Sequence, residues 1–438
     1  MLQKLSNYII NNLPFLKDKK LLIAISGGVD SVALTHLLSK LNFDVSLAHC
    51  NFNLRATESN LDEYFVKNLG KNLNIPVFTT QFNTIQFAKN NKQSTQIAAR
   101  NLRYNWFNEL IEEHDFDYLL TAHHADDNLE TFLINLTRGT GLDGLTGIPE
   151  INGNIVRPLL PFSREEIKTF AKENNIDWRE DKSNASTKYT RNKVRHLIIP
   201  VLKEINPSLL ETFSKTTEHL KESQQIIEDK ISDVSSKIIA KEKSFLKLDI
   251  KELEKTSNPK AYLYQLLTAY NFTEWNDVYN LLSAQSGKRI YSKTHVLLKD
   301  RNYLVLSKQE KKISKDKTFI IEENEIAITN PIHLKIEEVR KKYAEDKQTI
   351  YVDKQSLDFP LKIRKWKNGD FFYPSGMTGK KKLSKYFKDE KFSLLEKENI
   401  WLLCSNNDEI IWIINHRKDN RFYKKESNKT LLKISVKP

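Results

Sequence analysis

Short apolar runs alternate with longer amphipathic segments through the first 140 residues. The runs predict strands that are buried on both faces, and the segments between them predict helices. The expected strands are 21–25, 43–50, 76–82 and 116–122, and the expected helices are 29–40, 57–73, 95–114 and 129–136. Strands that alternate with helices in this order indicate an α/β domain with a mostly parallel sheet and right-handed crossovers.

The first apolar run ends in a turn of small residues that leads directly into a helix, which is expected to begin at Val29. Such a turn aims several backbone N–H groups at one point, which is also the positive end of the helix dipole. Pyrophosphate would fit there, with the carboxylate of Asp30 holding a cation beside it. An ordinary strand-to-helix turn is the alternative. The candidate anion-binding residues are Ser26, Gly27, Gly28, Val29, Asp30 and Ser31.

Polar side chains also follow the second and fourth predicted strands. After the second strand come His49, Asn51 and Arg55, and after the fourth come His123, His124, Asp126 and Asp127. Ligands of parallel α/β sheets bind at the carboxyl ends of the strands, so we expect both clusters to meet the glycine turn at one edge of the sheet. For the two histidines, a structural pair that caps the strand is the alternative.

Downstream of this cluster the sequence predicts connecting segments and one more helix. The stretch 138–145 is glycine-dense and predicts either a loop over the site or a plain connector. Residues 157–162 are expected to be extended. Ser163 and Glu166 then predict a capping box for a helix that ends at about residue 173.

A pair of arginines follows on a further predicted helix. Thr190 can cap this helix, and Arg191 and Arg195 lie one turn apart on one face. Two guanidinium groups on one face suit a polyphosphate or an RNA backbone. Solvated surface is the alternative for this pair.

Beyond residue 207 the apolar pattern changes. A long lysine- and glutamate-rich helix is expected first, and the further elements are helices at 261–270 and 275–283, paired strands at 288–308, a charged linker at 308–317 and strand-like runs at 318–352. We therefore expect three domains, an α/β domain at 1–207, a middle domain at 208–350 that begins largely helical, and a small α+β domain at 351–438.

Basic and aromatic residues are interleaved in the last expected domain. The lysines are Lys380, Lys381, Lys382 and Lys385, and the aromatic residues near them are Trp366, Phe371, Phe372, Tyr373 and Tyr386. Phosphate attraction combined with base stacking suits RNA. The same aromatic residues could equally form the core of a small domain.

The composition of the chain limits the classes of partner and the cellular compartment that we expect for this protein. The chain has 438 residues, a formal net charge of +13 and two cysteines. The charge favours a polyanionic partner, nucleic acid first and an anionic membrane surface second, although a lysine-rich composition contributes to the charge. With so few cysteines we expect no structural zinc, no iron–sulfur cluster and a reducing cytoplasm. The sequence shows no secretory signal and no apolar run of membrane-spanning length.

The motifs together resemble a known family. SGGVDS at 26–31 resembles the PP-loop of the N-type ATP pyrophosphatases, and the chain as a whole resembles the tRNA(Ile)-lysidine synthases in their long form with two C-terminal domains. The matching segments are HCNFNLR at 49–55, AARNLRY at 98–104, TAHHADDNLETFLINLTRGTGLDGL at 121–145, RPLLPFSREEI at 157–167, DKSNAS at 181–186, YTRNKVRHLIIPVL at 189–202 and KIRKWKNGDFFYPSGMTGKKKLSKYF at 362–387.

This resemblance implies a fold and a reaction. The fold is a Rossmann-like, parallel-sheet PP-loop domain, followed by a helical or mixed middle domain and a small α+β domain that both bind tRNA. In the reaction, ATP adenylates the C2 carbonyl oxygen of the wobble cytidine in the isoleucine tRNA with a CAU anticodon, and pyrophosphate leaves. The ε-amine of free lysine then attacks C2, and AMP leaves. The product is lysidine.

The chemistry assigns hypothetical roles to the polar residues. Mg²⁺ would be held by Asp30 and Asp127, and the catalytic candidates are these two residues with His123 or His124 as the base that takes a proton from lysine. The ammonium of lysine needs carboxylates, for which the candidates are Asp126, Asp127 and Glu130. ATP would meet the glycine turn together with His49, Asn51 and Arg55, and the candidates for contact with phosphates or tRNA are Arg103, Arg191, Arg195, Lys380, Lys381, Lys382 and Lys385.

Rival functions share parts of this pattern. tRNA-thiolating enzymes share the loop but generally use a pair of catalytic cysteines, and Cys50 and Cys404 lie in different expected domains. GMP and NAD synthetases share the loop without a basic, aromatic C-terminal unit. A non-catalytic ATP- or RNA-binding protein is the rival of another class, but such a protein gains nothing from carboxylates beside a phosphate site. The oligomeric state stays open, with a homodimer as one option.

Overall fold

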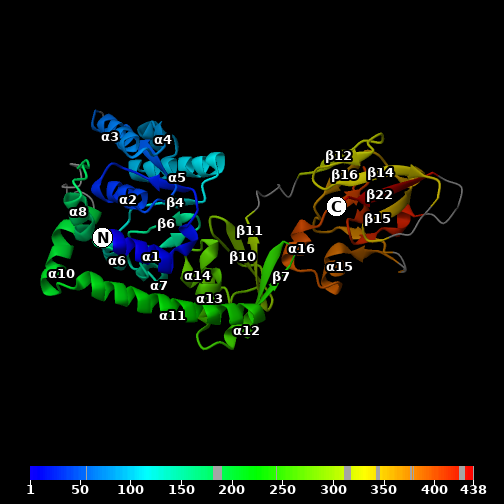
Figure 1. Ribbon diagram of the computed structural model, residues 1–438. Coiled ribbons are helices and arrows are strands. Elements are labelled where there is room, and N and C mark those ends of the chain that lie inside the picture. Colours follow the sequence, from blue (N-terminus) through cyan, green and yellow to red (C-terminus); the bar gives the residue numbers. More distant parts are fainter. Residues whose placement is uncertain are drawn as a thin grey trace. The chain divides into compact units, whose positions relative to one another are not determined.

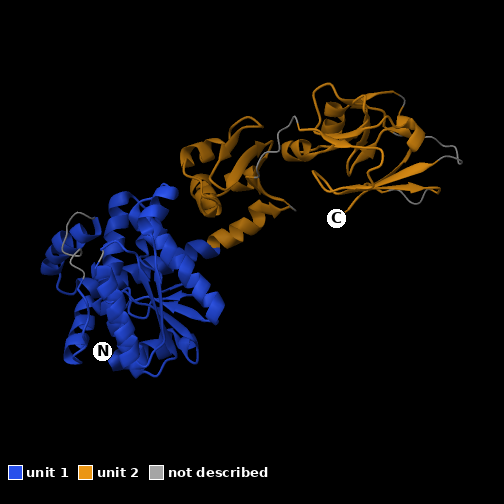
Figure 2. Ribbon diagram, turned by 90° about the horizontal axis from the view of Figure 1, so that it is seen from above, with its two compact units in different colours: residues 1–229 blue, residues 230–438 orange. Residues whose placement is uncertain are grey.

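The computed structural model describes residues 1–55, 57–180, 190–242, 244–309, 317–341, 346–374, 377, 379–423 and 430–437. The chain divides into two compact units, residues 1–229 and 230–438 (Figure 2). Most of the expected linker at 308–317 and the DKSNAS segment of the resemblance lie outside the described residues. None of the helices in the described ranges combines the length and the apolar character that a membrane span requires.

Unit 1 is built on a six-stranded sheet with the order β3-β2-β1-β4-β6-β5. Figure 1 labels β4 and β6 of this sheet. The strands are β1 (Leu21–Ala24), β2 (Val45–Asn51), β3 (Val77–Gln81), β4 (Tyr118–Leu120), β5 (Ile151–Asn152) and β6 (Ile155–Val156). All neighbours pair in parallel except β5 with β6. The chain runs outward from β1 to β3 and then returns to the other side of β1 with β4. The switch point of the sheet, where such folds bind ligands, therefore lies between β1 and β4.

Helices cover both faces of this sheet. Alternate residues of β1 separate two cores, because Leu21 and Ile23 pack with α2, whereas Leu22 packs with Phe107 and Leu110 of α5. The helices up to residue 180 are α1 (Leu2–Asn12), α2 (Val29–Lys40), α3 (Thr57–Leu73), α4 (Thr84–Asn90), α5 (Thr95–His114), α6 (Ala125–Arg138), α7 (Leu142–Leu145) and α8 (Arg164–Glu173). The expected bounds of α2, α3 and α5 are confirmed, and so is the α/β fold class.

Three local expectations for this unit need correction. Helix α6 begins at Ala125 rather than at residue 129, so Asp126 and Asp127 lie in its first turn, where carboxylates favour a helix N-terminus. Helix α4 was not expected. The stretch 157–162 forms turns rather than an extended segment, because Leu160 N donates to the carbonyl oxygen of Arg157.

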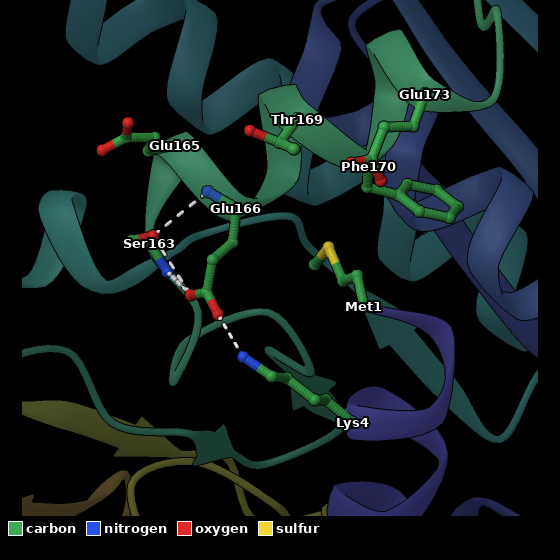
Figure 3. A pocket seen from close by; sticks show the side chains of 8 residues that line it. All are labelled: Met1, Lys4, Ser163, Glu165, Glu166, Thr169, Phe170 and Glu173. Carbon is green, nitrogen blue, oxygen red and sulfur yellow. Dashed lines mark hydrogen bonds and ion pairs between the residues drawn. The ribbon is translucent and has the colours of Figure 1, made fainter.

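The expected capping box of α8 is confirmed (Figure 3). Ser163 Oγ accepts from the backbone N of Glu166, and the Glu166 carboxylate accepts from the backbone N of Ser163. Lys4 of α1 pairs with the same carboxylate at 2.9 Å. These residues line a surface hollow that contains none of the predicted site residues. The pair between Lys4 and Glu166 links α1 to α8 in this unit.

The chain continues through α9 (Thr190–Lys193), a π-helical turn (Val194–Ile198), α10 (Ile199–Ile205) and the long helix α11 (Leu209–Ile238). Thr190 is the first residue of α9 rather than a residue that precedes it. Leu129 of α6 packs with Val194, Ile199 and Phe213 in a separate small core. This contact places the segment that carries Arg191 and Arg195 against α6.

The first part of unit 2 is an antiparallel sheet with the order β7-β8-β11-β10-β9. The strands are β7 (Ile239–Lys241), β8 (Phe245–Asp249), β9 (Arg289–Tyr291), β10 (His295–Asp300) and β11 (Tyr303–Lys308), and the helices are α12 (Ile250–Glu254), α13 (Pro259–Leu267) and α14 (Trp275–Asn280). The paired strands expected at 288–308 are confirmed, since β10 and β11 form a hairpin.

The rest of unit 2 contains two antiparallel sheets and a small hairpin. Their orders are β12-β16-β19-β20-β21, β13-β14-β22-β15 and β17-β18. Strands on both sides of residue 350 share one core, because Ile321 and Ile336 pack with Ile363 and Ile434. The elements are β12 (Phe319–Ile321), β13 (Ala327–Ile328), β14 (Leu334–Val339), β15 (Thr349–Asp353), β16 (Leu361–Arg364), β17 (Phe371–Phe372), β18 (Lys381–Lys382), α15 (Leu383–Asp389), α16 (Leu394–Asn399), β19 (Leu402–Cys404), β20 (Ile410–Ile413), β21 (Arg417–Lys418) and β22 (Leu431–Val436).

Candidate active site

Hydrogen bonds of Ser31 fix the conformation of the turn after β1. Ser31 Oγ accepts from the backbone N of Ser26 at 3.2 Å and donates to the carbonyl oxygen of Gly28 at 3.0 Å. Gly27 has a φ of +90°, which L side chains rarely adopt. Gly28 is the N-cap of α2 and offers no side chain to the N–H groups of the first turn. Those donors are therefore oriented toward a ligand on the helix axis.

The loops after β1 and β4 meet at a histidine. His124 Nε2 lies 3.7 Å from Asp30 Oδ2 and 3.4 Å from Asp127 Oδ2. His124 is also the N-cap of α6, where its ring accepts from the backbone N of Asp127 and its own backbone N donates to the Asp127 carboxylate. One imidazole thus ties together the two helix N-termini that flank the switch point.

The two neighbouring histidines are in different electrostatic environments. Burial lowers the pKa of His123 to about 4, and its Nδ1 lies 2.9 Å from Thr121 Oγ1. Burial would also lower the pKa of His124, but the carboxylates of Asp30 and Asp127 outweigh it and raise that pKa. His123 is therefore neutral at neutral pH, whereas His124 favours the charged form.

Glu130 is buried, with 1% of its side chain exposed, between two arginines. Arg191 Nε lies 2.9 Å from Glu130 Oε2, and Arg195 Nε lies 2.5 Å from Glu130 Oε1. Arg195 also reaches Asp127 Oδ1 at 3.1 Å. The expected common face of the two arginines is confirmed, but their partners here are carboxylates of α6. A buried carboxylate needs such compensation.

Asp126 points to a different set of partners. Its Oδ2 accepts from the backbone N of Arg164 at 2.8 Å, and its Oδ1 pairs with Lys203 at 2.7 Å. The carboxylate therefore joins the N-termini of α6 and α8 to α10. This contact is a structural role that the sequence expectation for lysine binding did not include.

The residues at the end of β2 and just beyond it contact the turn after β1 and helix α3. His49 Nδ1 lies 3.0 Å from the carbonyl oxygen of Ile25, and its buried Nε2 has no hydrogen-bond partner among the described residues. Burial lowers the pKa of this histidine. Asn51 donates to Glu63 at 2.9 Å, and Arg55 reaches Asp62 at 2.9 Å. These side chains fasten α3 beside the glycine turn.

Arg103 and the C-terminal lysines occupy other places. The Arg103 guanidinium lies 5.2 Å from the centre of the Phe52 ring, next to the end of β2. The lysines belong to unit 2, where Lys381 pairs with Asp389 at 2.8 Å and Lys380, Lys382 and Lys385 are exposed. The aromatic residues near them divide between core and surface, since Phe372 and Tyr386 are buried in a core cluster.

Sequence reasoning missed two cations that hold this region together. The backbone N of Arg179 donates to the carbonyl oxygen of Gly27 at 2.9 Å, and its guanidinium pairs with Glu58 and Asp62 of α3. Lys203 is the partner of Asp126 described above. Both partnerships join residues far apart in the chain, so no local spacing could have revealed them.

Comparison with known proteins defines the class to which this site belongs. The sequence model of the PP-loop domain matches residues 1–202, which include the turn after β1 and the loop after β4. The chain is thus a PP-loop enzyme, a class that uses ATP as a substrate. Models of the TilS substrate binding domain and the TilS substrate C-terminal domain match residues 241–310 and 361–435.

Full-length relatives narrow this class to one family. The tRNA(Ile)-lysidine synthase of Parabacteroides distasonis is 40% identical over 96% of both chains. The tRNA(Ile)-lysidine synthase of Bacteroides thetaiotaomicron is 40% identical over 98% of both chains. The tRNA(Ile)-lysidine synthase of Porphyromonas gingivalis is 35% identical over 92% of this chain and 91% of the relative. The chain belongs to the tRNA(Ile)-lysidine synthase family, as its motifs predicted, and tRNA is its partner.

Proposed function

We propose that this protein ligates free L-lysine to C2 of the wobble cytidine in the isoleucine tRNA with a CAU anticodon. ATP activates the cytidine as an adenylate, and the products are lysidine, AMP and pyrophosphate. The observation that supports this proposal best is the approach of both Asp30 and Asp127 to His124 beside the N-terminus of α2. We place the reaction in the cytoplasm, as expected from the sequence.

In the first step the cytidine oxygen attacks the α-phosphorus and pyrophosphate leaves. The negative charge that develops on the leaving group would be stabilised by backbone N–H groups of Gly27, Gly28 and Ser31. Of these, the Gly28 N–H must first leave Ser26 Oγ, to which it donates at 3.3 Å. Asp30 Oδ1 is buried without a hydrogen-bond partner among the described residues, which suits a cation. Mg²⁺ held by Asp30 and Asp127 would neutralise phosphate charge there, in keeping with its preference for one or two carboxylates plus phosphate oxygens.

In the second step the amine of lysine must lose a proton before it attacks C2. We assign His123 to accept this proton, because burial keeps its ring neutral, whereas the ring of His124 is held between Asp30 and Asp127. The lysine ammonium is best placed at Asp127 and Glu130, because Asp126 is engaged by Lys203 and Arg164. Arg191, the more exposed of the two arginines on Glu130, is the one that lysine would displace.

One assay tests the reaction itself. The protein is incubated with ATP, radiolabelled lysine and bulk tRNA. Label that becomes acid-precipitable with the tRNA, in an amount matched by AMP, is the expected result. ATP binding without AMP release, or a transfer of sulfur instead of lysine, would contradict the proposal.

A variant then tests the site. Asp30→Ala should abolish AMP formation while tRNA binding survives, since this carboxylate lies at the reacting phosphates and not on a surface for RNA. The expected loss is at least on the order of 100-fold. The matched variant Asp44→Ala, in the exposed loop before β2, should keep full activity. An active Asp30→Ala protein would refute the assignment.

A further inference from the structure

The β17–β18 hairpin sorts its side chains onto two faces. In the antiparallel register Phe371 lies opposite Lys382, and Phe372 lies opposite Lys381. Directly opposed residues point to the same face of a sheet. Phe372 is fully buried in the core of this part of unit 2. The other face therefore carries Phe371 and Lys382, and 38% of Phe371 is exposed.

A second ring and further cations surround Phe371. Lys380 Nζ lies 5.0 Å from the centre of the Phe371 ring, and the Tyr373 ring meets Phe371 edge-on at 6.1 Å. The Arg421 guanidinium covers the Tyr373 ring at 4.5 Å and is itself held by Asp419 at 3.0 Å. Arg421 thus holds Tyr373 in place. Among the described residues, Lys380 lies over the Phe371 ring, and the long side chain of a lysine can move to another partner.

We propose that this outward face, formed by Phe371, Tyr373, Lys380 and Lys382 and here called the hairpin platform, binds an unpaired nucleotide of the tRNA. Base stacking on an exposed ring and phosphate attraction to lysines are the two terms that single-stranded RNA recognition combines. A duplex hides the faces of its bases, so an exposed ring has no partner there. The identity of the RNA rests on the proposed function, whereas the preference for an unpaired nucleotide rests on the platform alone.

The charge around the platform favours RNA over an apolar protein segment. Lys380, Lys382 and Lys385 are all exposed on this hairpin or on the helix that follows it. Lys381, on the buried face, is instead neutralised by Asp389. Lys380 beside the Phe371 ring and Lys382 opposite it therefore place positive charge on the same side as the exposed ring, which is the arrangement that a base with its phosphate requires.

Binding of whole tRNA to the full-length protein tests the platform. Phe371→Ala should weaken binding by about 5-fold or more, which is the usual cost of losing one stacked base. Phe371→Trp should restore it, because any aromatic face suffices. The matched control is Ile320→Ala, which removes an apolar side chain of similar exposure on β12 in the same unit and should change nothing. Wild-type affinity in Phe371→Ala would overturn the proposal.

A crosslinking experiment identifies the nucleotide. Phe371→p-benzoylphenylalanine is irradiated with bound tRNA, and the crosslinked position is mapped by primer extension. A crosslink to an unpaired nucleotide supports the platform, and a crosslink confined to paired nucleotides overturns it. If the wild type never incorporates lysine but Phe371→Ala still loses tRNA binding, the proposed function is refuted and the platform is not. If the wild type incorporates lysine and Phe371→Ala binds tRNA normally, the platform is refuted and the proposed function is not.

Discussion

The edge of the unit 1 sheet and the hairpin platform both concentrate charge, but they treat it in opposite ways. At the sheet edge the charges are buried and compensate one another, as Glu130 does with Arg191 and Arg195. On the platform the lysines are exposed, and the phosphates of a bound ligand can neutralise their positive charge. Buried pairs depend strongly on every member, whereas exposed charges are screened and act nearly independently. The difference predicts which substitutions have large effects and which have small ones.

The largest effect on stability is expected from breaking the buried cluster. Arg195→Met leaves Glu130 and Asp127 without a cation that now lies between them, and should lower the free energy of unfolding by about 3 kcal/mol. Arg191→Met should cost clearly less, because Arg191 is the more exposed arginine and Arg195 still neutralises Glu130. Urea denaturation measures both.

A double variant separates lost compensation from lost packing. In Glu130→Leu/Arg195→Met the carboxylate at residue 130 is removed together with one of its two cations, so part of the lost stability should return even though activity should not. If the double variant is less stable than Arg195→Met alone, Arg195 stabilises the fold through its packing rather than through its charge. The contrast between compensated charges at the sheet edge and exposed charges on the platform would then not explain the effect.

The next effect comes from His123 and depends on pH. Because burial lowers its pKa to about 4, the folded protein binds a proton there less readily than the unfolded chain does. The contribution of His123 to the free energy of unfolding should therefore be complete above pH 6.5, and it should decrease as the pH falls from 6.5 toward 4. The raised pKa of His124 acts in the opposite sense, since its contribution is present below pH 6.5 and is lost as the pH rises.

His123→Asn should accordingly flatten the loss of stability between pH 6.5 and pH 4. Urea denaturation of wild type and variant at several pH values in this range gives the slopes. His219→Asn, which changes an exposed histidine of α11, is the matched control and should keep the wild-type slope. Parallel slopes in wild type and His123→Asn would mean that this histidine titrates as if it were exposed.

The sequence predicted the local part of this architecture well and the long-range part poorly. The bounds of α2, α3 and α5 follow from apolar periodicity and capping residues, both of which act within a few positions. The start of α6 was placed too late, since the acidic residues that favour a helix N-terminus were interpreted as part of a loop. Periodicity also could not show that strands before residue 350 share a core with strands after it.

The same limit applies to the candidate site. Asp30, His124 and Asp127 could be brought together from the sequence because each follows a strand of one parallel sheet, and the structure places them within ion-pair distance. The partners of Glu130 and Asp126 could not be foreseen, because Arg195 and Lys203 reach them from elements more than 60 residues away. Exposure was equally hidden, so Phe371 and Phe372 looked alike until the hairpin register separated them.

A smaller effect is expected from the backbone of the glycine turn. Gly27→Ala must keep a φ of +90°, which costs an L residue about 1–2 kcal/mol, although its Cβ would meet only ordinary contacts. Gly28→Ala is the matched control, because Gly28 has an ordinary φ of −74° and its Cβ would lie 3.5 Å from Ser26 Oγ. Thermal denaturation should show a lower melting temperature for Gly27→Ala alone. Equal losses would mean that space, and not backbone conformation, selects glycine here.

The smallest effect is expected on the platform and is best seen in its salt dependence. Each lysine that contacts a phosphate adds about 1 to the slope of log affinity against log salt concentration, so Lys382→Gln should reduce this slope by about 1. Lys381→Gln should reduce it less, because Lys381 already pairs with Asp389. Titration of tRNA at several salt concentrations measures both slopes. Equal reductions would show that the ion pair between Lys381 and Asp389 opens when tRNA binds. A ligand would then replace one partner of an ion pair at the hairpin, just as substrate lysine is expected to replace Arg191 at Glu130.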